Sequence, residues 1–179
     1  LRLPETLSSE KDILGEDEKK TLYKILNEVL KDLEGYRKNE GAELGKDINL
    51  RIDLIESHLQ SAVKIDPERN TKIEEKLRSA LEDLKQEVDT NRFEQELIFY
   101  LEKFDITEEK VRLKNHLNYF REVMENDFPN GKKLGFISQE IGREINTIGS
   151  KANHTELQKI VVQMKDELEK IKEQLLNVL

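Results

Sequence analysis

The stretch "LQKIVVQMKDELEKIKEQLLNV" (residues 157–178) carries the most regular hydrophobic pattern in the chain. Its apolar residues alternate steps of four and three, and they are Leu157, Val161, Met164, Leu168, Ile171, Leu175 and Val178. This spacing is the heptad repeat of a coiled coil, continued over about three heptads. We therefore predict an α-helix that packs lengthwise against another helix, either in the same chain or in a neighbouring copy.

Helical periodicity also runs through most of the remaining sequence, and no strand pattern competes with it. We predict an all-α protein in which a long helical hairpin is followed by a compact helical bundle with a C-terminal coiled-coil-like helix. The predicted division is an irregular lead-in over residues 1–16, a long antiparallel helical hairpin over 17–88 and a C-terminal helical domain over 89–179.

The turn of the predicted hairpin is "DPERN" (66–70), where a proline interrupts the helical pattern. Thr71 and Glu74 follow it with the spacing of a capping box, in which the two residues satisfy each other's helix-start amides. The sequence therefore predicts one helix over 17–64 and a second over 72–88.

Two glycines interrupt the hydrophobic stripe of the first predicted helix, at Gly41 and Gly45. Each costs about 1 kcal/mol of helix stability relative to alanine. A bend of the helix at this point and close approach of another backbone are two reasons for a helix to keep such residues.

The composition favours long, paired helices over one large core. Charged residues make up 38% of the 179 residues, aromatic residues only 6%, and tryptophan is absent. The formal net charge of −8 argues against a surface that is basic all over and binds nucleic acid non-specifically. A local basic groove is compatible with that average.

The absence of cysteine excludes disulfides and thiolate metal sites and is compatible with a reducing cytoplasm. No apolar run reaches about 18 residues, and the N-terminus lacks the shape of a signal peptide. We expect a cytoplasmic protein that does not engage a membrane. Because the chain begins at Leu1 and not at methionine, we expect a segment to precede it.

The stretch "GKKLGFISQEIGREINTIGSK" (131–151) carries candidate chemistry beside an isoleucine stripe about 80° wide. Glu140 and Glu144 are one turn apart, so they can share a divalent cation such as Mg²⁺ or Mn²⁺, or transfer protons. The planar fork of Arg143 can pair with a phosphate. The plainer alternative is a surface pair of glutamates with an Arg–Glu salt bridge.

Two further groups of residues suit phosphate. Arg112, His116 and Tyr119 recur at turn spacing, and histidine can act as an acid, a base, a metal ligand or a phosphate donor. Lys132 and Lys133 follow a turn at a helix start, which favours anion binding. A histidine on a helix flank is more often structural, and lysine pairs are common on surfaces, so both groups also have a plain explanation.

Long motifs in this chain resemble the YicC/YloC family of bacterial proteins. They are "NRFEQELIFYLEKFDITEEKVRLKNHL" (91–117) and "GKKLGFISQEIGREINTIGSKAN" (131–153), with "RKNEGAEL" (37–44) and the opening "LRLPETL" in support. Two departures stand out: Lys132 replaces the family's usual arginine, and Gly135 replaces an aspartate, which removes one possible metal ligand.

The resemblance implies a divalent-metal-dependent endoribonuclease with a stress-related role in bacterial RNA turnover. It also implies an additional N-terminal α/β domain and a homo-oligomer, a hexamer in the family, with RNA and not DNA as the nucleic-acid partner. The expected catalytic residues are Glu140, Glu144, His116 and Arg143, with Glu140 and Glu144 as ligands of Mg²⁺ or Mn²⁺. The expected RNA-binding residues are Arg112, Lys132, Lys133, Lys151 and Arg37.

Two other functions fit the same sequence. The chain could be a non-catalytic adaptor that binds RNA and delivers it to other nucleases, or a helical oligomerisation scaffold without a site. The observation that best separates these functions is whether five side chains converge on one concave surface, those of Arg112, His116, Glu140, Arg143 and Glu144.

Overall fold

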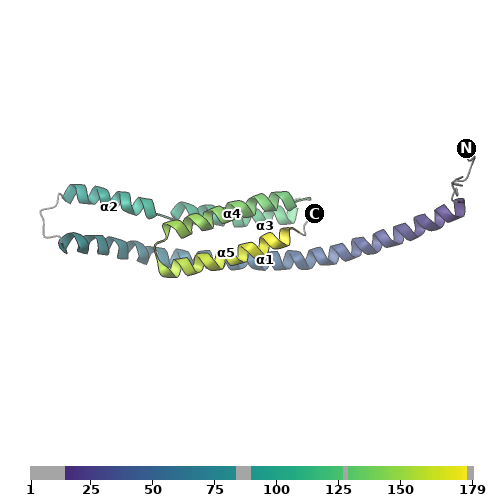
Figure 1. The fold of residues 1–179 in the computed structure, drawn as a ribbon, viewed down its shortest axis with the longest axis horizontal. Coiled ribbons are helices and arrows are strands. Elements are labelled where there is room, and N and C mark those ends of the chain that lie inside the picture. The colour runs from purple at the N-terminus through teal and green to yellow at the C-terminus, as the bar shows by residue number, and fades with distance from the viewer. Residues whose placement is uncertain (1–14, 84–89, 127–128, 177–179) are drawn as a thin grey trace, which may run out of the picture. The chain divides into compact units, whose positions relative to one another are not determined.

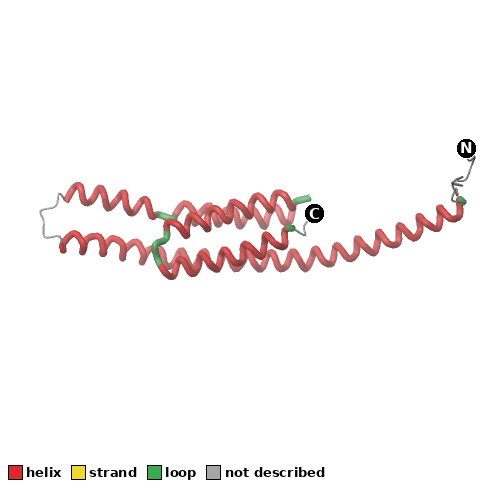
Figure 2. The backbone as a smooth tube through the Cα atoms, in the orientation of Figure 1, coloured by secondary structure: helices red, strands yellow, loops and turns green. Residues whose placement is uncertain are grey.

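The computed structural model describes residues 15–83, 90–126 and 129–176. Within these ranges all regular structure is α-helical and no strand occurs, which confirms the all-α prediction (Figure 2). The helices are α1 (Glu16–Asp83), α2 (Thr90–Phe104), α3 (Thr107–Asn126), α4 (Gly131–Lys151) and α5 (Thr155–Leu175). Among the described residues, no helix has the length and apolar character needed to cross a membrane.

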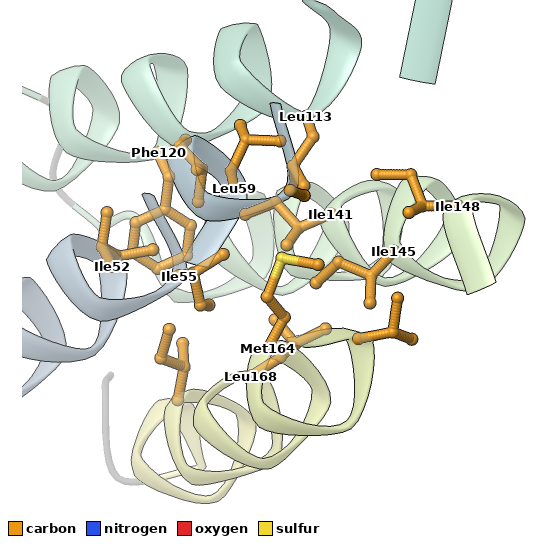
Figure 3. Close-up of a cluster of buried hydrophobic side chains, with 14 of the residues drawn as sticks. Ile52, Ile55, Leu59, Leu113, Phe120, Ile141, Ile145, Ile148, Met164 and Leu168 are labelled. Carbon is orange, nitrogen blue, oxygen red and sulfur yellow. The ribbon is translucent and has the colours of Figure 1, made fainter. Parts of the chain in front are cut away.

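The chain divides into two compact units, Leu1–Ala42 and Glu43–Leu179. The hydrophobic core belongs to the second unit, where α3, α4 and α5 pack with the part of α1 around Ile48 to Ala62. Figure 3 shows side chains from these four helices meeting in one cluster, among them Ile55, Phe120 and Met164. This core holds α3 and α4 in fixed positions, and both carry candidate site residues.

The apolar face of α5 packs against other helices of the same chain. Its buried side chains are Leu157, Ile160, Val161, Met164, Leu168 and Ile171, all part of the core. The helix was therefore predicted correctly, and its apolar face is covered by α4 and α1 of the same chain. Val178 lies outside the described residues.

Glycines mark where α4 approaches α5 closely. A Cβ added at Gly149 would lie 3.0 Å from Cγ1 of Val161, and one at Gly142 would lie 3.2 Å from Cδ2 of Leu168. At Gly41 and Gly45, by contrast, an added Cβ would meet nothing within 4 Å. Close approach of another element therefore does not account for these two glycines among the described residues.

The predicted hairpin turn at residues 66–70 is also wrong, because α1 continues through Pro67 to Asp83. Thr71 does not cap a new helix, since its hydroxyl donates back to the Pro67 carbonyl at 3.2 Å. The predicted second helix of the hairpin is thus the end of α1, and its last residues, 84–88, lie outside the described residues. The irregular lead-in lies outside them as well, except at Gly15 and Glu16.

A buried ionic network explains why the helix persists past the proline. Arg69 is 1% exposed, and its guanidinium lies 2.7 Å from the Asp66 carboxylate. It also donates to the carbonyl oxygens of Phe104 at 2.9 Å and Lys151 at 3.4 Å. Lys110 reaches the second Asp66 oxygen at 2.5 Å. An interior proline costs about 3 kcal/mol, and moving Arg69 away from Asp66 would leave a buried charge without its partner, so these contacts hold the chain in place on both sides of the proline.

Two arginines fix α1 to the bundle near its middle. Arg121 of α3 reaches Asp53 and Glu56, each at 2.7 Å. Arg51 donates to Glu167 of α5 at 3.1 Å. Burial raises the pKa of Glu167, but hydrogen bonds from Lys170 and Arg51 outweigh it, so this pKa lies below its usual value.

Candidate functional site between α3 and α4

Helices α3 and α4 lie side by side and antiparallel (Figure 1). At one end the Lys133 ammonium lies over the Tyr119 ring, 5.3 Å from its centroid. At the other end the Lys151 ammonium reaches Glu109 Oε1 at 2.7 Å and the Asp105 carbonyl at 3.0 Å. These two contacts fix which face of α4 is turned toward α3.

Helix register places the candidate carboxylates on that same face. Lys133 and Lys151 are 18 residues apart in α4, which is about five full turns, so both point in one direction. Glu140 and Glu144 lie between them and deviate from that direction by only about 20°.

The facing side of α3 carries the other candidates. Glu109 and Tyr119 mark its two ends, and Arg112 and His116 lie between them in a sector about 80° wide. We call the strip formed by both faces the α3–α4 seam. Its residues are Glu109, Arg112, His116, Tyr119, Lys133, Glu140, Glu144 and Lys151.

Glu144 is the unusual member of the seam. It is only 4% exposed, and its side chain forms no hydrogen bond or ion pair with any residue that the structure describes. Its carboxylate oxygens still reach solvent, unlike Glu109 Oε2, which is buried without a partner. An unpartnered carboxylate in such a position can accept a cation, a proton or a hydrogen-bond donor from a ligand.

Glu109 is a second buried carboxylate in the seam, and the sequence-based predictions missed it. It is 5% exposed, and while Oε1 accepts from Lys151, Oε2 is buried without a hydrogen-bond partner. A usable signal was present, because Glu109 lies one turn before Leu113 on the apolar stripe of α3. Tyr119, which the spacing of α3 had placed with Arg112 and His116, is 43% exposed.

The exposed candidates pair along their own helices. The Arg143 guanidinium lies 3.2 Å from Glu140, with side chains 71% and 40% exposed, so the salt bridge of the plainer alternative does form. Arg112 pairs with Glu108 one turn earlier in α3. His116 is half-buried and forms no hydrogen bond with a described residue.

Some of the predicted site residues lie outside the seam. Lys132 and Arg143 are exposed and lie about 80–100° around α4 from Lys133, on a flank beside the seam. Arg37 belongs to the Leu1–Ala42 unit and is not part of the seam. Helix register thus assigns six predicted residues to the two faces of the seam, namely Arg112, His116, Lys133, Glu140, Glu144 and Lys151, and leaves the other three outside it.

The seam offers few ligands to a metal. Across the described ranges, no three His, Asp or Glu side chains gather closely enough to hold an ion. Mg²⁺ commonly takes one or two protein carboxylates and completes its shell with water and phosphate oxygens. Glu144, buried and unpartnered, suits that role, whereas Glu140 would first have to release Arg143.

Comparison with known proteins places this chain in a family. The family model described as "Endoribonuclease YicC-like, C-terminal" matches residues 62–179, which include the whole seam. The chain therefore belongs to the YicC-like endoribonuclease family, as its motifs predicted.

Two relatives carry the name "Probable endoribonuclease YicC". The one from Clostridioides difficile is 36% identical over 91% of this chain and 58% of its own length. The one from Haemophilus influenzae is 28% identical over 99% of this chain and 62% of its own length. This chain thus spans about three fifths of these longer proteins.

Proposed function

We propose that this chain is the helical part of an RNA-cleaving endoribonuclease and that the α3–α4 seam meets the scissile phosphodiester. The observation that carries the proposal is Glu144, a glutamate that is 4% exposed and has no hydrogen-bond partner in the described part of the chain, on the face of α4 between Lys133 and Lys151. The names of the relatives support the reaction class.

Electrostatics suggest how RNA would approach. The net charge of −8 repels a polyanion on average, so binding has to rely on local cations. Arg112, Lys132 and Arg143 are exposed on or beside the seam and suit phosphate contacts. A phosphate that pairs with Arg143 would compete with Glu140 for the guanidinium and leave that carboxylate available.

The seam also has the groups that phosphodiester cleavage requires. A base must remove a proton from the attacking oxygen, an acid must protonate the leaving oxygen, and cations must stabilise the charge that develops on phosphorus. In our proposal Glu144 either accepts the first proton or holds a divalent cation, and His116, one turn from Arg112 on the facing helix, serves the leaving group. Lys133 and Lys151 contribute positive charge from the two ends.

Metal dependence belongs to the same proposal. A divalent cation held by Glu144 and Glu140, together with water and phosphate oxygens, would supply charge neutralisation at the scissile phosphate. The role in bacterial RNA turnover under stress, the homo-oligomeric state and the cytoplasmic location are likewise proposed, on the strength of the family. RNA is proposed over DNA as the substrate.

Cleavage of a labelled RNA tests the proposal, with Mg²⁺, with Mn²⁺ and with EDTA. We expect Glu144→Gln and the double variant Glu140→Gln with Glu144→Gln to lose at least about 100-fold in rate, the usual contribution of acid–base catalysis. Glu169→Gln is the matched control, because Glu169 is exposed on α5 and pairs only with Lys172. It should cleave at the unmodified rate.

Binding measurements separate the alternatives. An adaptor binds RNA with the usual decline in affinity as salt rises and cleaves nothing. A scaffold binds no RNA even at low salt. The C. difficile relative, assayed in parallel, shows whether missing activity reflects the seam or the shorter length of this chain.

A further inference from the structure

The first part of α1 exposes an apolar face that nothing in the described chain covers. Eight large apolar side chains there are each 46–65% exposed: Leu22, Tyr23, Ile25, Leu26, Val29, Leu30, Leu33 and Tyr36. All eight belong to the Leu1–Ala42 unit. Contiguous apolar patches of this kind mark interaction sites more often than ordinary surface.

The face has the order of a packing surface. Leu22, Leu26, Val29, Leu33 and Tyr36 alternate steps of four and three, and we call these five residues the exposed stripe. In heptad terms Leu26 and Leu33 take position a, and the other three take position d. Because a helix in water gains most of its stability from packing such a face, the exposed stripe requires a partner helix.

We propose that the exposed stripe is covered by the same stripe of a second copy of this chain, parallel and in register. The argument comes from the residues that border the stripe. A parallel coiled coil brings each g residue next to the e residue that lies five positions later in its partner. Asp32 at g then meets Arg37 at e, and Ile25 at g meets Leu30 at e.

The antiparallel alternative matches poorly. It pairs a with d and g with g, so that with Leu26 opposite Val29 of the partner, Ile25 would lie beside Asp32 and place an aspartate against an apolar side chain. The outward positions Lys24 and Lys31 face solvent in either arrangement and do not discriminate. Charge complementarity therefore selects the parallel pairing, independently of any chemistry in the seam.

The mass of the 179-residue chain in solution tests the inference. Sedimentation velocity should give a multiple of 21.0 kDa, and Leu26→Glu should reduce it to the monomer with helicity retained. Leu50→Glu is the matched control, because Leu50 is 51% exposed on α1 outside the stripe, and it should leave the assembly intact. A monomeric unmodified chain at 100 µM or below, or an equal effect of both variants, overturns the inference.

Crosslinking tests the direction and register. Because the chain has no cysteine, single cysteines can be introduced without background reaction. In a parallel, in-register assembly Leu22→Cys crosslinks to its own copy, and so does Tyr36→Cys, since equal positions lie within disulfide reach. If neither forms such a crosslink but a mixture of the two does, the pairing is antiparallel and the proposal is wrong.

A charge exchange tests the proposed border contact. Asp32→Arg and Arg37→Asp each place like charges across the interface and should weaken association severalfold at low salt. The double variant restores opposite charges and should recover most of the affinity. If the double variant is as weak as the two single ones, Asp32 does not meet Arg37 of the partner. Association of a monomeric chain with lipid vesicles would assign the stripe to a membrane surface instead.

Discussion

Two segments of this molecule share one hydrophobic pattern and have opposite environments. In α5, residues 157–175, the steps of four and three are buried in the core, whereas in α1, residues 22–36, the same steps are exposed. The connections explain the difference. Three residues, Ala152–His154, join α4 to α5 and let one pack on the other, while residues 22–36 continue without interruption into the rest of α1, and a continuous helix cannot fold back on itself. A heptad repeat thus predicts that a partner exists, and the neighbouring turns indicate where it comes from.

The largest effect expected from this comparison is on core stability. Leu168→Ala should lower the free energy of unfolding by about 2–5 kcal/mol, because Leu168 is 2% exposed and its loss leaves a cavity. Leu26→Ala, at 49% exposure, should cost less than about 0.5 kcal/mol in the monomer. Urea titrations at a concentration where the chain is monomeric measure both. If both variants lost the same free energy of unfolding under those conditions, the stripe would be buried within one chain. The difference between residues 22–36 and α5 would then not exist.

A smaller effect is expected at the closest contact of α4 with α5. Gly149→Ala should lower the free energy of unfolding by about 1–3 kcal/mol, because the new methyl group meets buried, β-branched Val161 at 3.0 Å. Gly35→Ala, in the helix of the exposed stripe, should instead stabilise the helix by up to about 1 kcal/mol, since nothing lies within 4 Å. Urea titration followed by far-UV circular dichroism shows whether each variant raises or lowers the free energy of unfolding. A stabilised Gly149→Ala would mean that Val161 yields and that α4 and α5 pack loosely.

The sequence predicted the features that depend on local periodicity. Helix type and the apolar face of α5 follow from spacing alone, because burial of one face is a property of consecutive residues. The continuation of α1 through Pro67 does not. It depends on Arg69 reaching the carbonyls of Phe104 and Lys151, which are distant in sequence. No local rule reveals such partners.

The candidate site shows the same limit. The family motifs identified Glu140, Glu144 and His116, and helix register predicted that the two glutamates share a face. Sequence reasoning assumed that charges are exposed, so the burial of Glu144, at 4% exposure, was not foreseen. Glu109 was missed for the same reason. Burial of a charge is decided by the neighbouring helix, and a single sequence does not show that neighbour.

The smallest effect separates the two segments by their response to acid. Glu167 of α5 has a folded-state pKa below its usual value, because hydrogen bonds from Lys170 and Arg51 outweigh the effect of burial. A carboxylate with a lowered pKa stabilises the folded protein above about pH 4.3, its ordinary unfolded value, and loses that contribution as the pH falls through the folded pKa. Glu167→Gln should therefore be less stable than the unmodified chain at pH 7, by less than about 1 kcal/mol, and the gap should close in acid.

Glu34, beside the exposed stripe, is the matched control for this experiment. It forms no ion pair with any residue in the described part of the chain, so Glu34→Gln has no such contact to lose. At pH 7 the urea midpoint of Glu167→Gln should lie below that of the unmodified chain, and the two midpoints should become equal as the pH falls to 3. The midpoint of Glu34→Gln should equal that of the unmodified chain throughout. A gap that persists unchanged at pH 3 would mean that Glu167 acts through packing and not through its charge. The ion pair with Arg51 would then not be what holds α5 to α1.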